Sequence, residues 1–276
     1  MHARAEPVRA ANASSQTCLS FDSVTMFEQP LNERIRSFLR LETLFDSIRV
    51  GTERDGTWDA RHAIIGMIEI SDQLARVDIK GELIKEIERH ASTLTALRDN
   101  PRVNQATLEH TVARLEPILA ILKSPGCQPG ARLRHSELAN QIKQRLAIPG
   151  GTCSFDLPAL HYWLHRAPRH RSEQLQAWMG DLRIVEDAIA TVLKLVRDSA
   201  IPQRVTAENG FYQHQLEANS ACQLVRLAVA AAAEVYPEIS GGKHRFAVRF
   251  VRNADVNSRA QQVQQNVPFE LHCCML

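Results

Sequence analysis

Two histidines, His161 and His165 in the stretch HYWLH, are four residues apart, which is the spacing of metal ligands on one helix face. The glutamate that follows the first histidine in zinc-hydrolase motifs is absent, because Tyr162 stands there. A closed site needs three or four ligands, and the remaining candidate is His170, in a predicted loop. Two interpretations follow, a metal-dependent hydrolase site or a helix face on which Trp163 packs, and we predict no metal.

A thiol nucleophile is the second chemistry that the sequence suggests. Cys153, Asp156 and His161 lie close together in TCSFDLPALH, and nucleophilic catalysis needs a thiolate beside an oriented base. Such sites are recognised by geometry rather than by local spacing, however. Asp156 is also in the right place to cap a short helix that begins near Pro158. We therefore predict no catalytic residues.

A cationic strip is the third feature. If RFAVRF at 245–250 is a strand, alternation places Arg245 and Arg249 on one face, on either side of a small alanine. Lys243 lies just upstream and Arg252 just beyond, and Arg226 occupies a similar position in QLVRLAV. The planar guanidinium group of arginine binds carboxylates through two parallel hydrogen bonds.

This strip has two interpretations, an ordinary solvated strand face or a site for carboxylate-bearing groups. A nucleic-acid-binding module using the same strip is a further alternative. Single-stranded nucleic acid would require aromatic side chains on the arginine face. Alternation instead sends Phe246 and Phe250 to the opposite face, which weakens that alternative, and we expect no nucleic-acid partner.

The elements that position these residues change along the chain. From Asn32 to about residue 200 the apolar residues recur with helical period, and Asn32, Asp78 and Asn104 are predicted helix caps. After Pro202 the period falls to two, with predicted strands at 223–230, 245–251 and 268–275. The stretch 23–28 has the same character and can join them.

The predicted fold is α+β, a large helical domain followed by a smaller antiparallel β-domain. We place a flexible N-terminal extension at 1–20, a strand that can join the β-domain at 21–30, the helical domain at 31–200 and the β-domain at 201–276.

Composition excludes several classes of function. The 276 residues carry a formal net charge of only +2, so any basic site must be local. Neither a glycine-rich nucleotide loop nor an apolar run long enough for a membrane span is present. The six cysteines form no C-x-x-C pair, which is typical of a reduced, cytoplasmic protein. No cofactor and no membrane partner are expected.

Five segments resemble the ZapD family of bacterial cell-division proteins. They are MFEQPLNERIRSFLRLE (26–42), IKQRLAIPGGTCSFDLPALHYWLH (142–165), NGFYQ (209–213), YPEISGGKHRFAVRF (236–250) and FELHCC (269–274), in the order of the family. The resemblance implies a non-enzymatic cytoplasmic homodimer at the midcell division ring. Such proteins bind the C-terminal tail of FtsZ, a tubulin-like GTPase, and bundle its protofilaments.

The resemblance also implies roles for individual residues. The family's tail-binding surface is basic and lies on the β-domain, at positions that match Arg245 and Arg249, with Lys243 just upstream. The family's dimer is associated with the helical domain, where Arg40 and His161 match positions that we expect near the interface. A dimer with one site on each chain would hold two tails at once by raising their effective concentration.

Overall fold

The computed structural model describes residues 24–98, 100–101, 103–216, 222–242, 244–253, 255 and 257–275. The predicted extension at 1–20 and Lys243 lie outside these described residues. The α+β prediction is confirmed, because helices occupy the first part of the chain and antiparallel strands the last part, together with one N-terminal strand. None of the described helices combines the length and apolar character needed to cross a membrane.

The helical part begins directly after the first strand. Its helices are α1 (Glu33–Thr52), α2 (Thr57–Arg76), α3 (Ile79–Ala96), α4 (Gln105–Lys123), α5 (Ala131–Arg134), α6 (Glu137–Arg145), α7 (Pro158–Leu164) and α8 (Pro168–Asp198). The three predicted caps are confirmed, since the Asn32, Asp78 and Asn104 side chains each accept a backbone N–H in the first helical turn.

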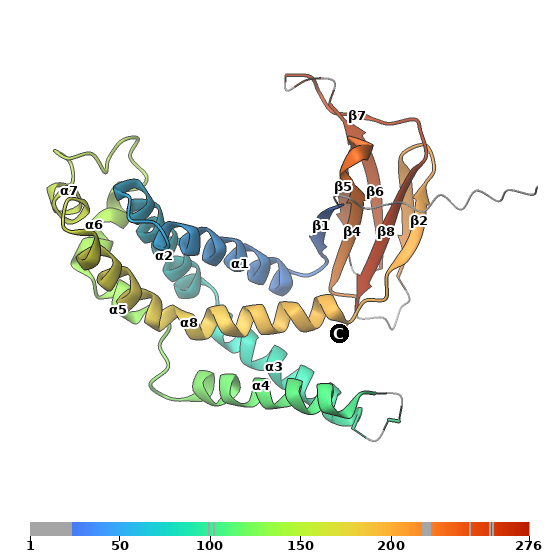
Figure 1. The fold of residues 1–276 in the computed structure, drawn as a ribbon, viewed down its shortest axis with the longest axis horizontal. Helices are drawn as coiled ribbons and strands as arrows, with labels where there is room; N and C mark the ends of the chain where they lie inside the picture. The colour runs from blue at the N-terminus through green and yellow to red at the C-terminus, as the bar shows by residue number, and fades with distance from the viewer. Residues whose placement is uncertain are drawn as a thin grey trace, which may run out of the picture.

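Helix α8 is the central helix of the helical part. It contacts α1, α2, α3 and α4, with the α1–α2 pair on one side and the α3–α4 pair on the other (Figure 1). Its buried residues recur at helical spacing, from Leu175 and Leu182 to Ile189 and Val196. The C-terminal end of α8 reaches the strands, where Ser199 Oγ accepts a hydrogen bond from the Met275 backbone at 3.0 Å.

The strands form a two-layer sandwich. They are β1 (Val24–Pro30), β2 (Gln203–Ala207), β3 (Phe211–Gln215), β4 (Leu224–Ala230), β5 (Tyr236–Gly241), β6 (Arg245–Arg252), β7 (Gln261–Gln262) and β8 (Val267–Cys274). Sheet A has the order β1-β4-β8-β2, and sheet B has the order β3-β6-β5, with β7 pairing β6. Apolar side chains of both sheets share one core, which includes Leu227 of β4 together with Phe246 and Phe250 of β6.

The N-terminal strand was correctly predicted to join the C-terminal ones, since β1 pairs β4 antiparallel along its whole length. The short strands β2, β3, β5 and β7 were not predicted. The turn between β2 and β3 contains Asn209 and Gly210, both with positive φ. Asn-Gly is a strong turn signal between strands and could have revealed that β2 and β3 are two strands joined by a tight turn, although they belong to different sheets.

Candidate partner-binding site

Strand β6 carries the predicted cationic strip. Phe246, Val248 and Phe250 are buried in the sandwich core, while Arg245 and Arg249 are exposed on the outer face of sheet B. The predicted alternation is therefore confirmed. Because β6 is the central strand of sheet B, its outer face is flanked by side chains from β3 and β5.

Two adjoining hollows follow this outer face, and we call them together the β6 trough. The first, of about 490 Å³, is lined by residues that include His244, Arg245 and Gln213. The second, of about 280 Å³, is lined by Phe211, Glu238, Ile239, Ser240, Ala247 and Arg249. Ser240 and Ala247 line both hollows, so small side chains form the low middle of the trough, between the two arginines.

The two arginines of the trough have different surroundings. Both Nε and Nη2 of Arg249 donate hydrogen bonds to the same carboxylate oxygen, Glu238 Oε2. Arg245 forms no ion pair with any acidic side chain among the described residues. The accessible positive charge of the trough is therefore concentrated at the Arg245 end.

The other predicted members of the strip lie elsewhere. Arg252, at the end of β6, donates to the backbone carbonyls of Ala233 and Glu234, each at 3.1 Å. Arg226 belongs to β4, in the other sheet, and its Nε lies 2.8 Å from Glu28 Oε1. The expectation that Arg226 is placed like Arg245 was therefore wrong, because local alternation does not say which sheet a strand joins.

Arg226 instead belongs to an ion-pair network between the sandwich and α8. Arg197 of α8 donates to both oxygens of Glu28 on β1, at 2.9 and 2.8 Å, and to both oxygens of Glu42 on α1, at 2.7 and 2.6 Å. Burial alone would raise the pKa of Glu28, but Arg197 and Arg226 outweigh that effect and lower the pKa below its usual value. The network thus joins β1 and β4 to the helical part.

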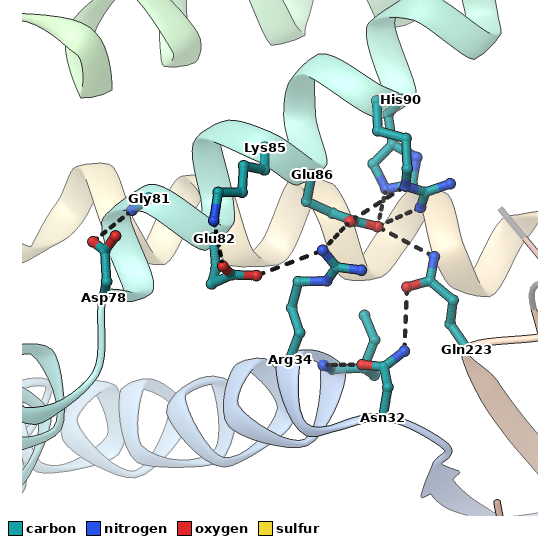
Figure 2. Close-up of polar contacts among 11 residues, drawn as sticks. Asn32, Arg34, Asp78, Gly81, Glu82, Lys85, Glu86, His90 and Gln223 are labelled. Atoms are coloured by element: carbon teal, nitrogen blue, oxygen red, sulfur yellow. Dashed lines mark hydrogen bonds and ion pairs between the residues drawn. The ribbon is translucent and has the colours of Figure 1, made fainter. Parts of the chain in front are cut away.

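A second polar cluster lies where α3 meets the start of β4 (Figure 2). Fully buried Glu86 has Arg34 Nη1 at 3.2 Å and His90 Nε2 at 3.3 Å, pairs with Arg89, and accepts from Gln223 Nε2 at 3.2 Å. Burial opposes ionisation, but the hydrogen bonds from His90, Arg89 and Gln223 outweigh it and hold the pKa of Glu86 well below its usual range. Ionised Glu86 therefore links the helical part to Gln223 at the start of the sandwich strand β4.

The cysteine–histidine region lies in the helical part, at α7. Cys153 Sγ donates to Asp156 Oδ2 at 3.4 Å, and Asp156 does not cap α7, whose N-cap is Leu157 without a side-chain bond. The prediction of an Asp156 cap was wrong. His161 and His165 lie with their ring centroids 4.3 Å apart. Within the part of the chain that the structure describes, no three His, Cys, Asp or Glu side chains are grouped to hold a metal.

The two residues expected near a dimer interface are both exposed. Arg40 lies on α1, and His161 lies on α7. His161 lines a hollow of about 410 Å³ together with Trp58, whose side chain is 73% exposed. Tyr162, beside His161 in the chain, is 71% exposed. This end of the helical part therefore presents large aromatic side chains to solvent.

Sequence reasoning missed two residues of the β6 trough, Phe211 and Glu238. Both are register partners of Arg249, Phe211 from β3 and Glu238 from β5. Phe211 is 45% exposed, so the trough has one aromatic side chain beside its arginines. The alternation of PEIS in 237–240, with Glu238 outward, was the signal that could have found the ion pair, but β5 was not predicted as a strand.

Comparison with known proteins shows the family of this chain. The family model ZapD, described as a cell division protein, matches residues 39–249. The cell division protein ZapD of Methylococcus capsulatus is 39% identical over 91% of this chain and 98% of its own length. The corresponding proteins of Dechloromonas aromatica (38% identical; 91% and 99%) and Escherichia coli O17:K52:H18 (36%; 90% and 98%) are similar to the same extent. The chain therefore belongs to the ZapD family of cell division proteins.

Proposed function

We propose that this chain is a non-enzymatic division factor that binds the C-terminal tail of FtsZ in the β6 trough. As a homodimer it cross-links and bundles FtsZ protofilaments in the cytoplasm, at the midcell division ring. It needs no cofactor, since binding and valency perform the whole task. Membership of a cell division family and the basic outer face of sheet B support this proposal.

The observation that carries the proposal is the charge of Arg245, which no acidic side chain of the described residues neutralises, at one end of the β6 trough. An extended peptide along β6 would pass over Ala247 and Ser240, whose small side chains leave room for it. A carboxylate of the peptide would meet Arg245, and an apolar side chain would rest on Phe211. A tail with both charged and apolar side chains would therefore match the Arg245 end and the Phe211 end of the trough.

Single-stranded nucleic acid is the second candidate, because Phe211 places one aromatic ring on the arginine face. Glu238 on the same face repels phosphates, and it neutralises Arg249. Of the two trough arginines, a backbone of repeated phosphates would therefore find only Arg245 without an acidic partner among the described residues, whereas a tail peptide needs few carboxylate contacts. The peptide is the better match to this charge arrangement.

We place the dimer interface on the helical part, around the exposed aromatic side chains Trp58 and Tyr162 next to His161. Burying such side chains against a second copy would remove a large apolar area from water. This location lies at the end of the helical part that is far from the sandwich (Figure 1). Two troughs would then point away from the interface and reach separate filaments.

Replacement of Arg245 by Glu, alone and combined with Arg249→Gln, tests the proposal by co-sedimentation with polymerised FtsZ. Gln is chosen at 249 because a glutamate there would oppose Glu238 across the strands. A charge-assisted bond contributes about 1.5–3 kcal/mol, so the single change should weaken binding at least about tenfold. The double change should abolish bundling.

The matched control is Arg204→Gln, which removes an exposed charge on the other sheet without placing a second carboxylate opposite Glu270. It should leave co-sedimentation unchanged. Circular dichroism and light scattering should show that all variants stay folded and dimeric. Normal bundling by the double variant would reject the β6 trough as the site, and binding of an oligonucleotide as tight as that of FtsZ would favour the second candidate.

A further inference from the structure

The pair of Arg249 and Glu238 occupies the position where a ligand carboxylate would bind. The two residues are direct register partners on neighbouring strands, and each is about half exposed. Two N–H groups of the guanidinium point at one oxygen of Glu238. An incoming carboxylate that binds Arg249 side-on, through Nε and Nη2, would use these same N–H groups, which point across the strands to β5.

The Arg245 end of the trough lacks such an acidic partner among the residues that the structure describes. Its register neighbour on β3 is Gln215, and the chain on its other side is the turn in which Gly242 N donates to the Arg245 carbonyl at 3.0 Å. Neither neighbour is acidic. Among the described residues, the two arginines of one strand face therefore offer unequal sites, since Arg249 already binds a carboxylate and Arg245 does not.

We propose that Glu238 is an internal competitor that limits the affinity of the trough for an acidic segment. This inference rests on the proposed function and assigns the regulation of that same site. The ligand class is an extended segment with two carboxylates about 13 Å apart, the length of four strand residues. One carboxylate binds Arg245 directly, and the other must displace Glu238 from Arg249.

The physical reason is that the second contact is an exchange. An exposed ion pair contributes little to stability, so Glu238 can be displaced. The exchange nevertheless returns little free energy, because one carboxylate replaces another, and the displaced Glu238 repels the acidic ligand. A single trough would then bind weakly and reversibly, and tight attachment would require both troughs of a dimer.

Glu238→Gln tests this inference, because it removes the competing charge and keeps the shape of the side chain. The probe is a fluorescent synthetic peptide with the C-terminal tail sequence of FtsZ, titrated with the full-length protein and followed by anisotropy at two salt concentrations. We expect the variant to bind about three- to tenfold more tightly than the wild type. Its binding should also fall more steeply with salt, since Arg249 is freed.

The matched control is Glu270→Gln, which removes the carboxylate of the cross-strand pair Arg204–Glu270 on sheet A and changes the net charge equally. Its affinity should stay within about twofold of the wild type, because Glu270 lies on the other sheet. In an Arg249→Gln background, the gain from Glu238→Gln should shrink, because the freed binding group is absent.

The outcomes separate the two proposals. Wild-type binding that Arg245→Glu abolishes and Glu238→Gln leaves unchanged or weakens would overturn the competitor role alone. An equal gain from Glu270→Gln would also overturn it, because net charge would then explain the effect. Absence of tail binding by the wild type and by Glu238→Gln would overturn the proposed function together with this inference.

Discussion

Arg197 is the side chain on which we expect the attachment of the sandwich to the helical part to depend most. It makes four hydrogen bonds, two to Glu28 on β1 and two to Glu42 on α1, and it is only 22% exposed. Replacement by Met keeps most of the volume and removes the charge. Glu28 and Glu42 would then remain partly buried, with Arg226 as the remaining partner of Glu28.

Removing one partner of a buried ion pair costs about 3–5 kcal/mol, and an exposed pair costs less than about 1 kcal/mol. The side chains of the network are roughly one-fifth exposed, and Arg226 still compensates the charge of Glu28. We therefore expect Arg197→Met to lower the free energy of unfolding by about 2–4 kcal/mol. Urea denaturation at pH 7 measures it. Lys194→Met is the control, because the exposed pair of Lys194 with Asp198 on the same helix should contribute less than about 0.5 kcal/mol.

The pH dependence gives a second test of the same network. The folded state lowers the pKa of Glu28, so its stabilisation is complete above the unfolded pKa and is lost as pH falls through the folded pKa. The stability difference between wild type and Arg197→Met should therefore narrow as pH falls below about 5. A difference under about 1 kcal/mol at pH 7, or one that pH does not change, would refute this account of the network.

Three further predictions concern the trough, the dimer and the second polar cluster. Phe211→Ala should weaken binding of the FtsZ tail peptide about three- to tenfold in the anisotropy assay, since an exposed ring is lost without loss of core; unchanged affinity would exclude an apolar contact there. Light scattering should give a molar mass twice the 31.0 kDa of one chain, and Trp58→Asp should lower that mass towards the mass of one chain. A Trp58→Asp variant that stays dimeric would place the interface elsewhere. Glu86→Gln should destabilise the fold by about 3 kcal/mol in urea denaturation, because it removes the carboxylate that Arg34 and Arg89 share; a cost as small as that of Lys194→Met would contradict this.

Features determined by neighbouring residues could be predicted from the sequence. The caps at Asn32, Asp78 and Asn104 depend on one side chain and the next three backbone groups. The faces of β6 depend on a period of two, which placed Arg245 and Arg249 outward. Both kinds of feature need no knowledge of the rest of the fold.

Features determined by pairing between distant segments could not be predicted. Arg226 and Arg249 have similar surroundings in the sequence, yet one joins sheet A beside Glu28 and the other joins sheet B beside Glu238. The difference arises from the strand order, which local pattern does not contain. Asp156 was wrongly predicted as a cap, because α7 begins one residue later than expected, with Leu157 at its N-cap, and the Asp156 side chain accepts a thiol hydrogen bond instead.

The position of β1 has a consequence for the synthesis of this protein. The residues of this strand come at the start of the described chain. Its partner β4 (Leu224–Ala230) comes after all eight described α-helices in the sequence. On the ribosome the helices emerge and can pack first, because domains fold as their residues appear. Until β4 has been translated, the nascent chain carries β1 as an unpaired strand edge, open to chaperones and to the same edge on neighbouring nascent chains.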